Sequence, residues 1–125
     1  MTIYIAGRYE SKGRLQEIRQ RVERLGHQVV STWLDEPESE YPTEMDSNAI
    51  RACALRDLVE IATADVLLLD TYDEDIHGGR EWEGGFGFGH PHLRVMLVGP
   101  RRNIFHTLVP MQFKSWEEAL QWLAR

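Results

Sequence analysis

The strongest constraint on the fold of this chain is the alternation of short β-rich runs with longer segments whose apolar residues recur at helical spacing. The five runs lie at residues 3–7, 27–33, 65–69, 93–98 and 111–113. Residues 65–69 and 93–98 are almost wholly apolar, which is typical of strands buried on both faces of a parallel sheet. Strands that alternate with helices form a doubly wound α/β fold. We therefore predict a single flavodoxin-like or Rossmann-like domain over residues 1–125, with about five parallel strands and helices on both faces.

The segments between these runs predict helices, in strict β-α alternation that includes a helix between the fourth and fifth strands. The helices are expected at residues 11–25, 48–63 and 80–89, with a last helix capped by Ser115. Ser11 fits the N-cap of the first helix and Gly26 fits the position just after its end. Residues 80–89 contain four glycines, so their helical interpretation rests on context. The inner face of the second helix is expected to hold Ile50, Leu55, Leu58, Val59 and Ala62.

Charge and cysteine content exclude several classes of protein. The formal net charge of −6 disfavours binding to a nucleic-acid polymer, and the pair Arg101 and Arg102 is too small to form a basic stripe. The single cysteine, Cys53, allows no intrachain disulfide and is interpreted as a buried structural thiol. No secretory leader and no apolar stretch of about 20 residues are visible. We expect a cytoplasmic protein that does not bind membranes.

The polar residues that follow the strands are the candidate site. In doubly wound sheets, ligands bind beyond the carboxyl ends of the strands, where the strand order reverses. The segment from Gly7 to Tyr9 lacks the dinucleotide-binding glycine pattern, and Arg8 either holds an anionic group or is simply solvated. The third strand is followed by an acidic loop with Asp70, Asp73, Glu74 and Asp75.

That acidic loop leaves three interpretations open, namely a solvated loop, a divalent-cation site or a catalytic loop. The spacing of its carboxylates does not match a known calcium loop, and the five histidines show no zinc spacing, so no metal is expected. Gly78 and Gly79 allow a ligand to approach the backbone closely. A carboxylate on the first turn of the following helix would project over the strand ends.

Four segments of the chain resemble the nucleoside 2-deoxyribosyltransferase-like family, in particular its short phage and bacterial members. They are residues 3–7, 56–69, 78–86 and 97–106. In the family's glycine-led segment, the nucleophilic glutamate lies four residues after one glycine and two before another. Glu83 keeps both spacings, to Gly79 and to Gly85.

The resemblance implies a role for each matching residue. Glu83 would be the covalent nucleophile, Tyr4 would hold its carboxylate in place, and Asp57 would contact the nucleobase or assist its departure. Asn103 would reach the site of a neighbouring subunit, which implies a homodimer with shared active sites, or a higher oligomer. Glu81 is a second candidate for the nucleophile. No cofactor is implied.

One family position differs here, because His77 stands where the family has an aspartate six residues before the nucleophile. Asp75 is a candidate substitute for it. The full set of expected substrate-binding residues is Gly7, Arg8, Asp70, Asp75, His77, Gly79, Arg80 and Asn103.

Three functions remain open from the sequence. The first is transfer of 2-deoxyribose between nucleobases, and the second is N-glycosidase hydrolysis of nucleoside 5′-monophosphates. The second needs an anion site, for which Arg8, Ser11, Arg80 and Arg102 of the partner subunit are candidates. The third is a nucleotide-sensing module without turnover.

Overall fold

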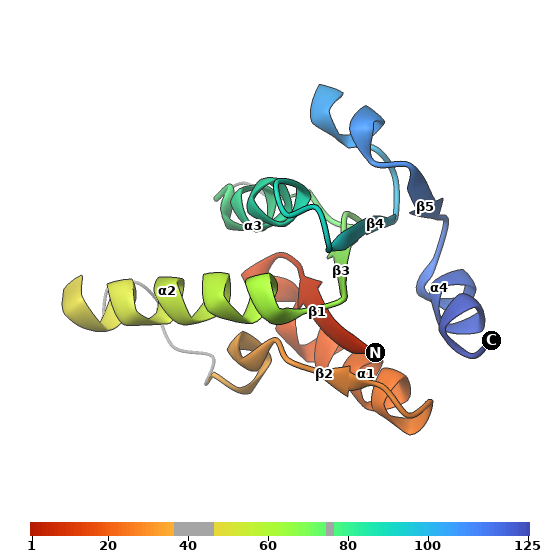
Figure 1. Ribbon diagram of the computed structural model, residues 1–125, viewed down its shortest axis with the longest axis horizontal. Coiled ribbons are helices and arrows are strands. Elements are labelled where there is room, and N and C mark those ends of the chain that lie inside the picture. Colours follow the sequence, from red (N-terminus) through yellow and green to blue (C-terminus); the bar gives the residue numbers. More distant parts are fainter. Residues whose placement is uncertain (37–46, 75–76) are drawn as a thin grey trace.

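The computed structural model describes residues 1–36, 47–74 and 77–125, and within these ranges it has a five-stranded, all-parallel sheet (Figure 1). The strands are β1 (Thr2–Ala6), β2 (Gln28–Val29), β3 (Val66–Asp70), β4 (Arg94–Val98) and β5 (Met111–Phe113). Their order in the sheet is β2-β1-β3-β4-β5. This is the flavodoxin-like order, which reverses direction between β1 and β3. The predicted doubly wound α/β fold is therefore confirmed.

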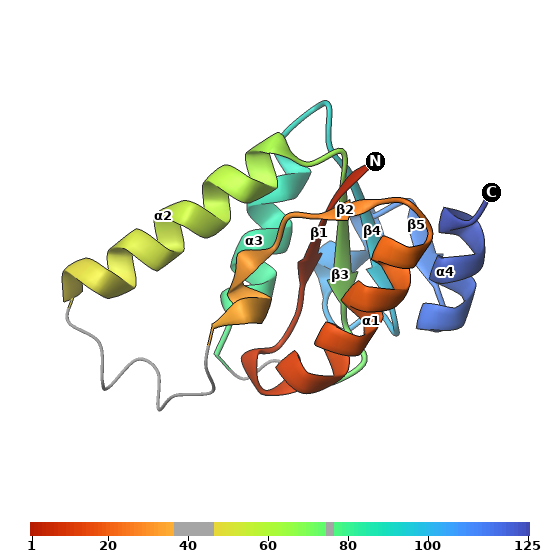
Figure 2. The ribbon, with the colours of Figure 1, turned by 90° about the horizontal axis from the view of Figure 1, so that it is seen from below.

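Within the described ranges, four α-helices cover the two faces of this sheet. They are α1 (Lys12–Arg24), α2 (Ser47–Thr63), α3 (Gly79–Phe88) and α4 (Trp116–Leu123). Figure 2 shows α2 and α3 on one side of the strands and α1 and α4 on the other. Within the described ranges, none of the helices combines the length and the apolar character needed to cross a membrane.

The second strand is much shorter than the predicted run at residues 27–33. Pairing with β1 ends after Val29 because side chains then bind the β1 backbone instead of the chain's own main-chain groups. The Ser31 hydroxyl accepts from the Ile5 amide at 3.0 Å, and the Trp33 indole donates to the Ile5 carbonyl at 2.8 Å. The chain is thereby free to turn into the 3-10 helix η2 (Thr32–Asp35). The predicted length of this strand was wrong because the local sequence does not show that side chains would replace backbone groups as partners of Ile5.

The helix predicted between β4 and β5 is also absent, and the short 3-10 helix η3 (Ile104–Leu108) takes its place. Asn103 begins η3, since its side-chain oxygen accepts from the amides of Phe105 and His106 at 2.9 and 3.1 Å. Pro110 follows at once and cannot donate to a longer helix.

The glycine-rich helix α3 confirms the contextual prediction for residues 80–89, and its glycines have a packing reason. A Cβ added to Gly84 would lie 3.1 Å from Leu69, and one added to Gly87 would lie 2.9 Å from Leu67. The helix backbone therefore lies directly on β3. Each glycine costs about 1 kcal/mol of helix propensity relative to alanine, and close packing on the sheet offsets that loss.

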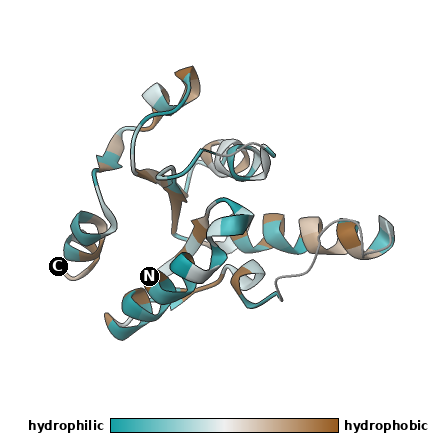
Figure 3. Ribbon diagram, turned by 180° about the vertical axis from the view of Figure 1, so that it is seen from behind, coloured by the Kyte–Doolittle hydropathy of each residue, from teal (hydrophilic) through white to brown (hydrophobic). Residues whose placement is uncertain are grey.

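Helix α2 departs from the predicted inner face. Ile61 is fully buried, whereas Leu55 is 50% exposed and Val59 is 63% exposed. Val59 and Leu55 lie about 200° and 240° around the helix from Ile61, so both face away from the buried side. Figure 2 also shows that only the C-terminal part of α2 lies against the sheet and that the rest projects beyond it. Figure 3 shows that this projecting part carries apolar turns.

Three smaller predictions have mixed outcomes. Gly26 does follow α1 with a left-handed backbone (φ 94°), as expected of a C′ glycine. Ser11 occupies the N-cap position, but its hydroxyl donates to Asp73 at 2.9 Å and does not cap the helix. Cys53 is half-buried, not buried, because α2 presents it to a cavity.

Candidate active site

A cavity of about 370 Å³ opens next to the carboxyl end of β1, on the side covered by α2 and α3. Its walls come from the segment after β1, from η2, from α2 and from the start of α3. The lining residues are Gly7, Tyr9, Glu10, Trp33, Glu36, Cys53, Asp57, His77, Gly79, Arg80 and Glu83. Six of the predicted site residues are thus brought together at the point where the strand order reverses: Gly7, Asp57, His77, Gly79, Arg80 and Glu83.

The carboxylate of Glu83 accepts a hydrogen bond from the hydroxyl of Tyr4, a residue 79 positions away in the chain. Tyr4 lies in the middle of β1 and is completely buried. Burial, followed by the negative charges of Glu83 and Asp57, raises the pKa of the Tyr4 phenol. The phenol therefore keeps its proton and stays a donor to Glu83 at neutral pH.

Asp57 lines the same cavity from α2. Burial raises its pKa to about 6, an effect that Arg56 opposes and that the neighbouring charges of Glu36 and Glu60 reinforce. The Arg56 guanidinium donates to Asp57 at 3.0 Å and also to Glu36. Asp57 can consequently hold or release a proton close to neutral pH.

Two aromatic rings form the wall that sequence reasoning missed. The rings of Tyr9 and Trp33 are tilted by 33°, with centroids 6.4 Å apart. The buried Lys12 lies behind them, with Nζ 4.2 Å from the Tyr9 ring centroid and donating to the Glu36 carbonyl at 2.5 Å. Trp33 is the last residue of a predicted strand and Tyr9 lies two residues after another, and these positions were the available signal. Flat rings of this kind offer a stacking surface to a nucleobase.

Four carboxylates line the cavity, from Glu10, Glu36, Asp57 and Glu83. The Arg80 guanidinium, only 2% exposed, binds the carbonyls of Asp70 and Asp73 and the carboxylate of Glu81.

His77 lies 3.4 Å from Glu10, and its side chain is 70% exposed. Among the described lining residues, the four carboxylates outnumber the one arginine, so the cavity lining is acidic.

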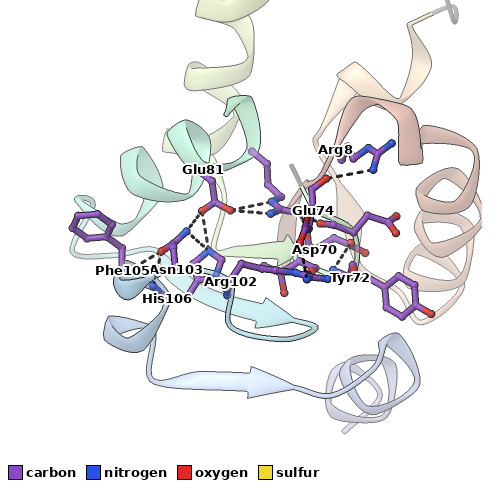
Figure 4. Close-up of polar contacts among 12 residues, drawn as sticks. Arg8, Asp70, Tyr72, Glu74, Glu81, Arg102, Asn103, Phe105 and His106 are labelled. Atoms are coloured by element: carbon purple, nitrogen blue, oxygen red, sulfur yellow. Dashed lines mark hydrogen bonds and ion pairs between the residues drawn. The ribbon is translucent and has the colours of Figure 1, made fainter. Parts of the chain in front are cut away.

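Several predicted substrate-binding residues lie outside the cavity lining (Figure 4). Asp70 is 1% exposed and accepts from Arg14 at 2.8 and 3.0 Å and from the Trp116 indole at 2.5 Å. Arg8 donates to Glu10 at 3.1 Å and to the Glu74 carbonyl at 3.3 Å.

Asp75, the candidate substitute for the family aspartate, is outside the described residues.

Glu81 and Asn103 meet on the other side of α3 (Figure 4). Two residues along an α-helix rotate the side chain by about 200°, so Glu81 points away from Glu83. Glu81 accepts from His106 at 2.8 Å and from Asn103 at 3.2 Å. Partial burial acts to raise the pKa of Glu81, but His106 and Arg80 together lower it.

Glu81, Asn103 and His106 line a second, more apolar cavity of about 230 Å³ between α3 and η3. No three metal-ligating side chains converge anywhere in residues 1–36, 47–74 and 77–125.

The chain resembles known proteins in its fold far more than in its sequence. No protein-family model matches the chain, and no curated protein sequence is similar enough to match it. The solved structure of a 2-deoxyribosyltransferase from Bacillus psychrosaccharolyticus, however, matches with a TM-score of 0.77 and 24% identity. The match covers 96% of this chain and 90% of that chain. The chain has the fold of a 2-deoxyribosyltransferase.

Two further structures share the 2-deoxyribosyltransferase fold. A conserved protein from Enterococcus faecalis V583 matches with a TM-score of 0.71 and 15% identity, over 98% of this chain and 96% of that chain. The CMP N-glycosidase BcmB from Clostridium botulinum matches with a TM-score of 0.62 and 15% identity, over the full length of both chains.

Proposed function

We propose that this protein is an enzyme of the nucleoside 2-deoxyribosyltransferase-like family, with residues 1–125 forming a domain of that family. It breaks the N-glycosidic bond of a 2′-deoxynucleoside and transfers the deoxyribose to another nucleobase. The observation that carries the proposal is the carboxylate of Glu83, which lines the cavity at the strand-order reversal and accepts the hydrogen bond of the buried Tyr4. The 2-deoxyribosyltransferase fold of the whole chain supports it.

In the first step, an oxygen of Glu83 attacks the anomeric carbon C1′ of the sugar. The C1′–N bond breaks, its electron pair leaves with the nucleobase, and a glycosyl ester to Glu83 forms. Protonated Asp57 donates its proton to the departing base, so that no anion has to be expelled. Its raised pKa suits this role.

In the second step, a ring nitrogen of another nucleobase attacks C1′ and the ester bond breaks, which returns the electron pair to Glu83. The proton displaced from the incoming base passes to Asp57, and the site is restored. Attack by water in place of the base would give hydrolysis. Neither step needs a metal or an organic cofactor.

Tyr4 serves as a positioning residue in this scheme. Its hydroxyl donates to one oxygen of the Glu83 carboxylate and thereby orients the group toward C1′. Tyr4 lies in the inner strand β1 and is fully buried, so its packing holds the hydroxyl in place beside the attacking carboxylate.

The substrate lies against the lining residues. Gly79 permits close approach of the backbone, and Tyr9 and Trp33 stack on the base. Gly7 lines the cavity, but a Cβ there would lie 2.4 Å from Leu15, so this glycine is required for packing. His77 contacts the sugar. For Arg8, Asp70 and Asp75, a role in substrate binding stays a prediction from the sequence, and Arg80 acts by holding the loop after β3.

Hydrolysis of nucleoside 5′-monophosphates is the second candidate, because the CMP N-glycosidase from Clostridium botulinum shares the fold. A phosphate needs unpaired cations. Among the described lining residues, four are carboxylates and the one arginine has its guanidinium buried against carbonyl groups. The acidic lining therefore favours uncharged nucleosides over nucleotides.

A homodimer with shared sites is the proposed assembly. Apolar side chains on α3 and η3 are strongly exposed, with Trp82 and Ile104 at 75%, Phe105 at 69% and Leu108 at 59%. Burial of such side chains in an interface would be favourable. Within one chain, the Asn103 side-chain nitrogen donates to Glu81 and its oxygen accepts from the Phe105 amide. Asn103 would therefore have to break its bond to Glu81 in order to enter a partner's site. A cytoplasmic location stays a prediction from the sequence.

The direct test incubates the protein with one 2′-deoxynucleoside and a second free base, followed by chromatography. We expect a new nucleoside, whereas free deoxyribose would indicate hydrolysis. Mass spectrometry of the protein quenched during turnover should find the glycosyl group on a peptide that contains Glu83. Binding of nucleosides without any cleavage would refute the enzymatic proposal in favour of the sensing module.

A further inference from the structure

Glu36 and Asp57 present two neighbouring carboxyl groups to one end of the cavity. Glu36 directly follows η2 and Asp57 lies on α2, yet the same terminal nitrogen of Arg56 donates to both, with 3.0 Å to Asp57. Both residues line the cavity, whereas Arg56 does not. The two carboxyl groups therefore lie side by side and face the space that a ligand would occupy.

The two carboxyl groups offer different hydrogen-bonding capacities to the cavity. Burial raises the pKa of Asp57 to about 6, so this group exists partly as a hydrogen-bond donor near neutral pH. Glu36 accepts a charge-assisted bond from Arg56 and keeps further lone pairs for the cavity. One end of the cavity consequently offers one donor and one acceptor, next to each other.

The aromatic wall places a flat ligand at this end of the cavity. Tyr9 and Trp33 line it from the segments after β1 and β2, and the Trp33 indole nitrogen is already bound to the Ile5 carbonyl. Trp33 thus contributes a surface and not a donor. The polar edge of a stacked base would be read by Glu36 and Asp57.

We propose, on the basis of the proposed function, that Glu36 and Asp57 select nucleobases that carry an amino group beside an unprotonated ring nitrogen. Asp57 donates to the ring nitrogen, which assists departure of the base, and Glu36 accepts from the amino group. Adenine presents this pair at N7 and its 6-amino group, and cytosine presents it at N3 and its 4-amino group. Hypoxanthine places an oxygen where Glu36 needs a donor, and N3 of uracil carries its own hydrogen.

Matched nucleosides test this selection, because 2′-deoxyadenosine and 2′-deoxyinosine differ at this one group, as do 2′-deoxycytidine and 2′-deoxyuridine. We expect kcat/KM to be about 10- to 100-fold higher for the amino member of each pair, the discrimination that such paired hydrogen bonds give. In Glu36→Gln, whose amide both donates and accepts, the ratio should fall to within about threefold. Glu10→Gln, the same change at another lining carboxylate, should keep the wild-type ratio.

Binding to Glu83→Ala, measured by calorimetry, separates this inference from the proposed function. Cleavage of both members of each pair at equal rates would overturn base selection and leave the glycosyl-transfer function intact. If the wild type cleaves no nucleoside but the amino members bind more tightly to Glu83→Ala, base selection stands and the enzymatic function fails. Equal binding of both members would overturn base selection by itself. Circular dichroism of each variant checks that the fold is retained.

Discussion

Helix α3 carries two glutamates that lie two residues apart and meet opposite environments. Glu83 faces the 370 Å³ cavity and has a buried phenol, Tyr4, as its hydrogen-bond donor. Glu81 faces η3 and is bound by Arg80, His106 and Asn103. Glu83 therefore meets a neutral donor and a cavity, whereas Glu81 is held by two positively chargeable side chains and an amide. The position of each glutamate around the helix, and not its residue type, therefore separates a candidate nucleophile from a structural ion pair.

The largest expected effect is that of Glu83→Gln. An amide is a poor nucleophile, so kcat should fall by about 10⁴-fold or more while the protein still folds. The matched control is Glu81→Gln, the same substitution on the same helix, which should keep kcat within a few fold. Equal losses in the two variants, measured in the base-exchange assay, would remove the distinction between the two glutamates.

Tyr4→Phe should have the next largest effect. The change removes one hydroxyl and leaves the ring packed in β1, so the Glu83 carboxylate loses the group that orients it. We expect kcat to fall by about 10²-fold, the scale of a small misplacement of a reacting group. Steady-state kinetics should show little change in KM. A variant with wild-type kcat would show that the hydrogen bond seen here does not serve catalysis.

The pH dependence of cleavage tests Asp57. Its pKa is raised to about 6 by burial, with Arg56, Glu36 and Glu60 as charged neighbours and Tyr4 and Glu83 across the cavity. The protonated form is the proton donor, so kcat/KM should decline about tenfold per pH unit above that pKa. Asp57→Asn should be slow at every pH and should lack this decline. A rate that rises through pH 6 to 8 in the wild type would contradict the assigned role.

The smallest effect on activity and a clear effect on stability are expected for Glu81→Ala. Loss of this carboxylate leaves the buried His106, 3% exposed, without its acceptor. A buried group without its partner costs about 1–3 kcal/mol in the free energy of unfolding. Urea denaturation should detect that loss, while the base-exchange rate should change only a few fold. A large loss of activity at unchanged stability would instead place Glu81 in the catalytic site.

The sequence predicted the sheet class, four of the five strands closely and the edge of the sheet at which the cavity lies. Buried strands and glycine-ended runs are local signals, and parallel topology follows from the alternation with helices. The length of β2 could not be predicted, since Ser31 and Trp33 bind Ile5 only once the two segments lie together. The partial exposure of α2 likewise depends on where the sheet ends.

What the sequence determined by itself is the α/β alternation and the set of chemically able residues, because both follow from the residue types and their order along the chain. Tertiary structure alone decided that Glu83 and Tyr4 meet, that Glu36 stands beside Asp57, and that Asp70 is held away from the cavity by Arg14 and Trp116. These contacts join residues up to 79 positions apart. Distances across such separations are set by the packing of helices on a twisted sheet, which no local pattern encodes.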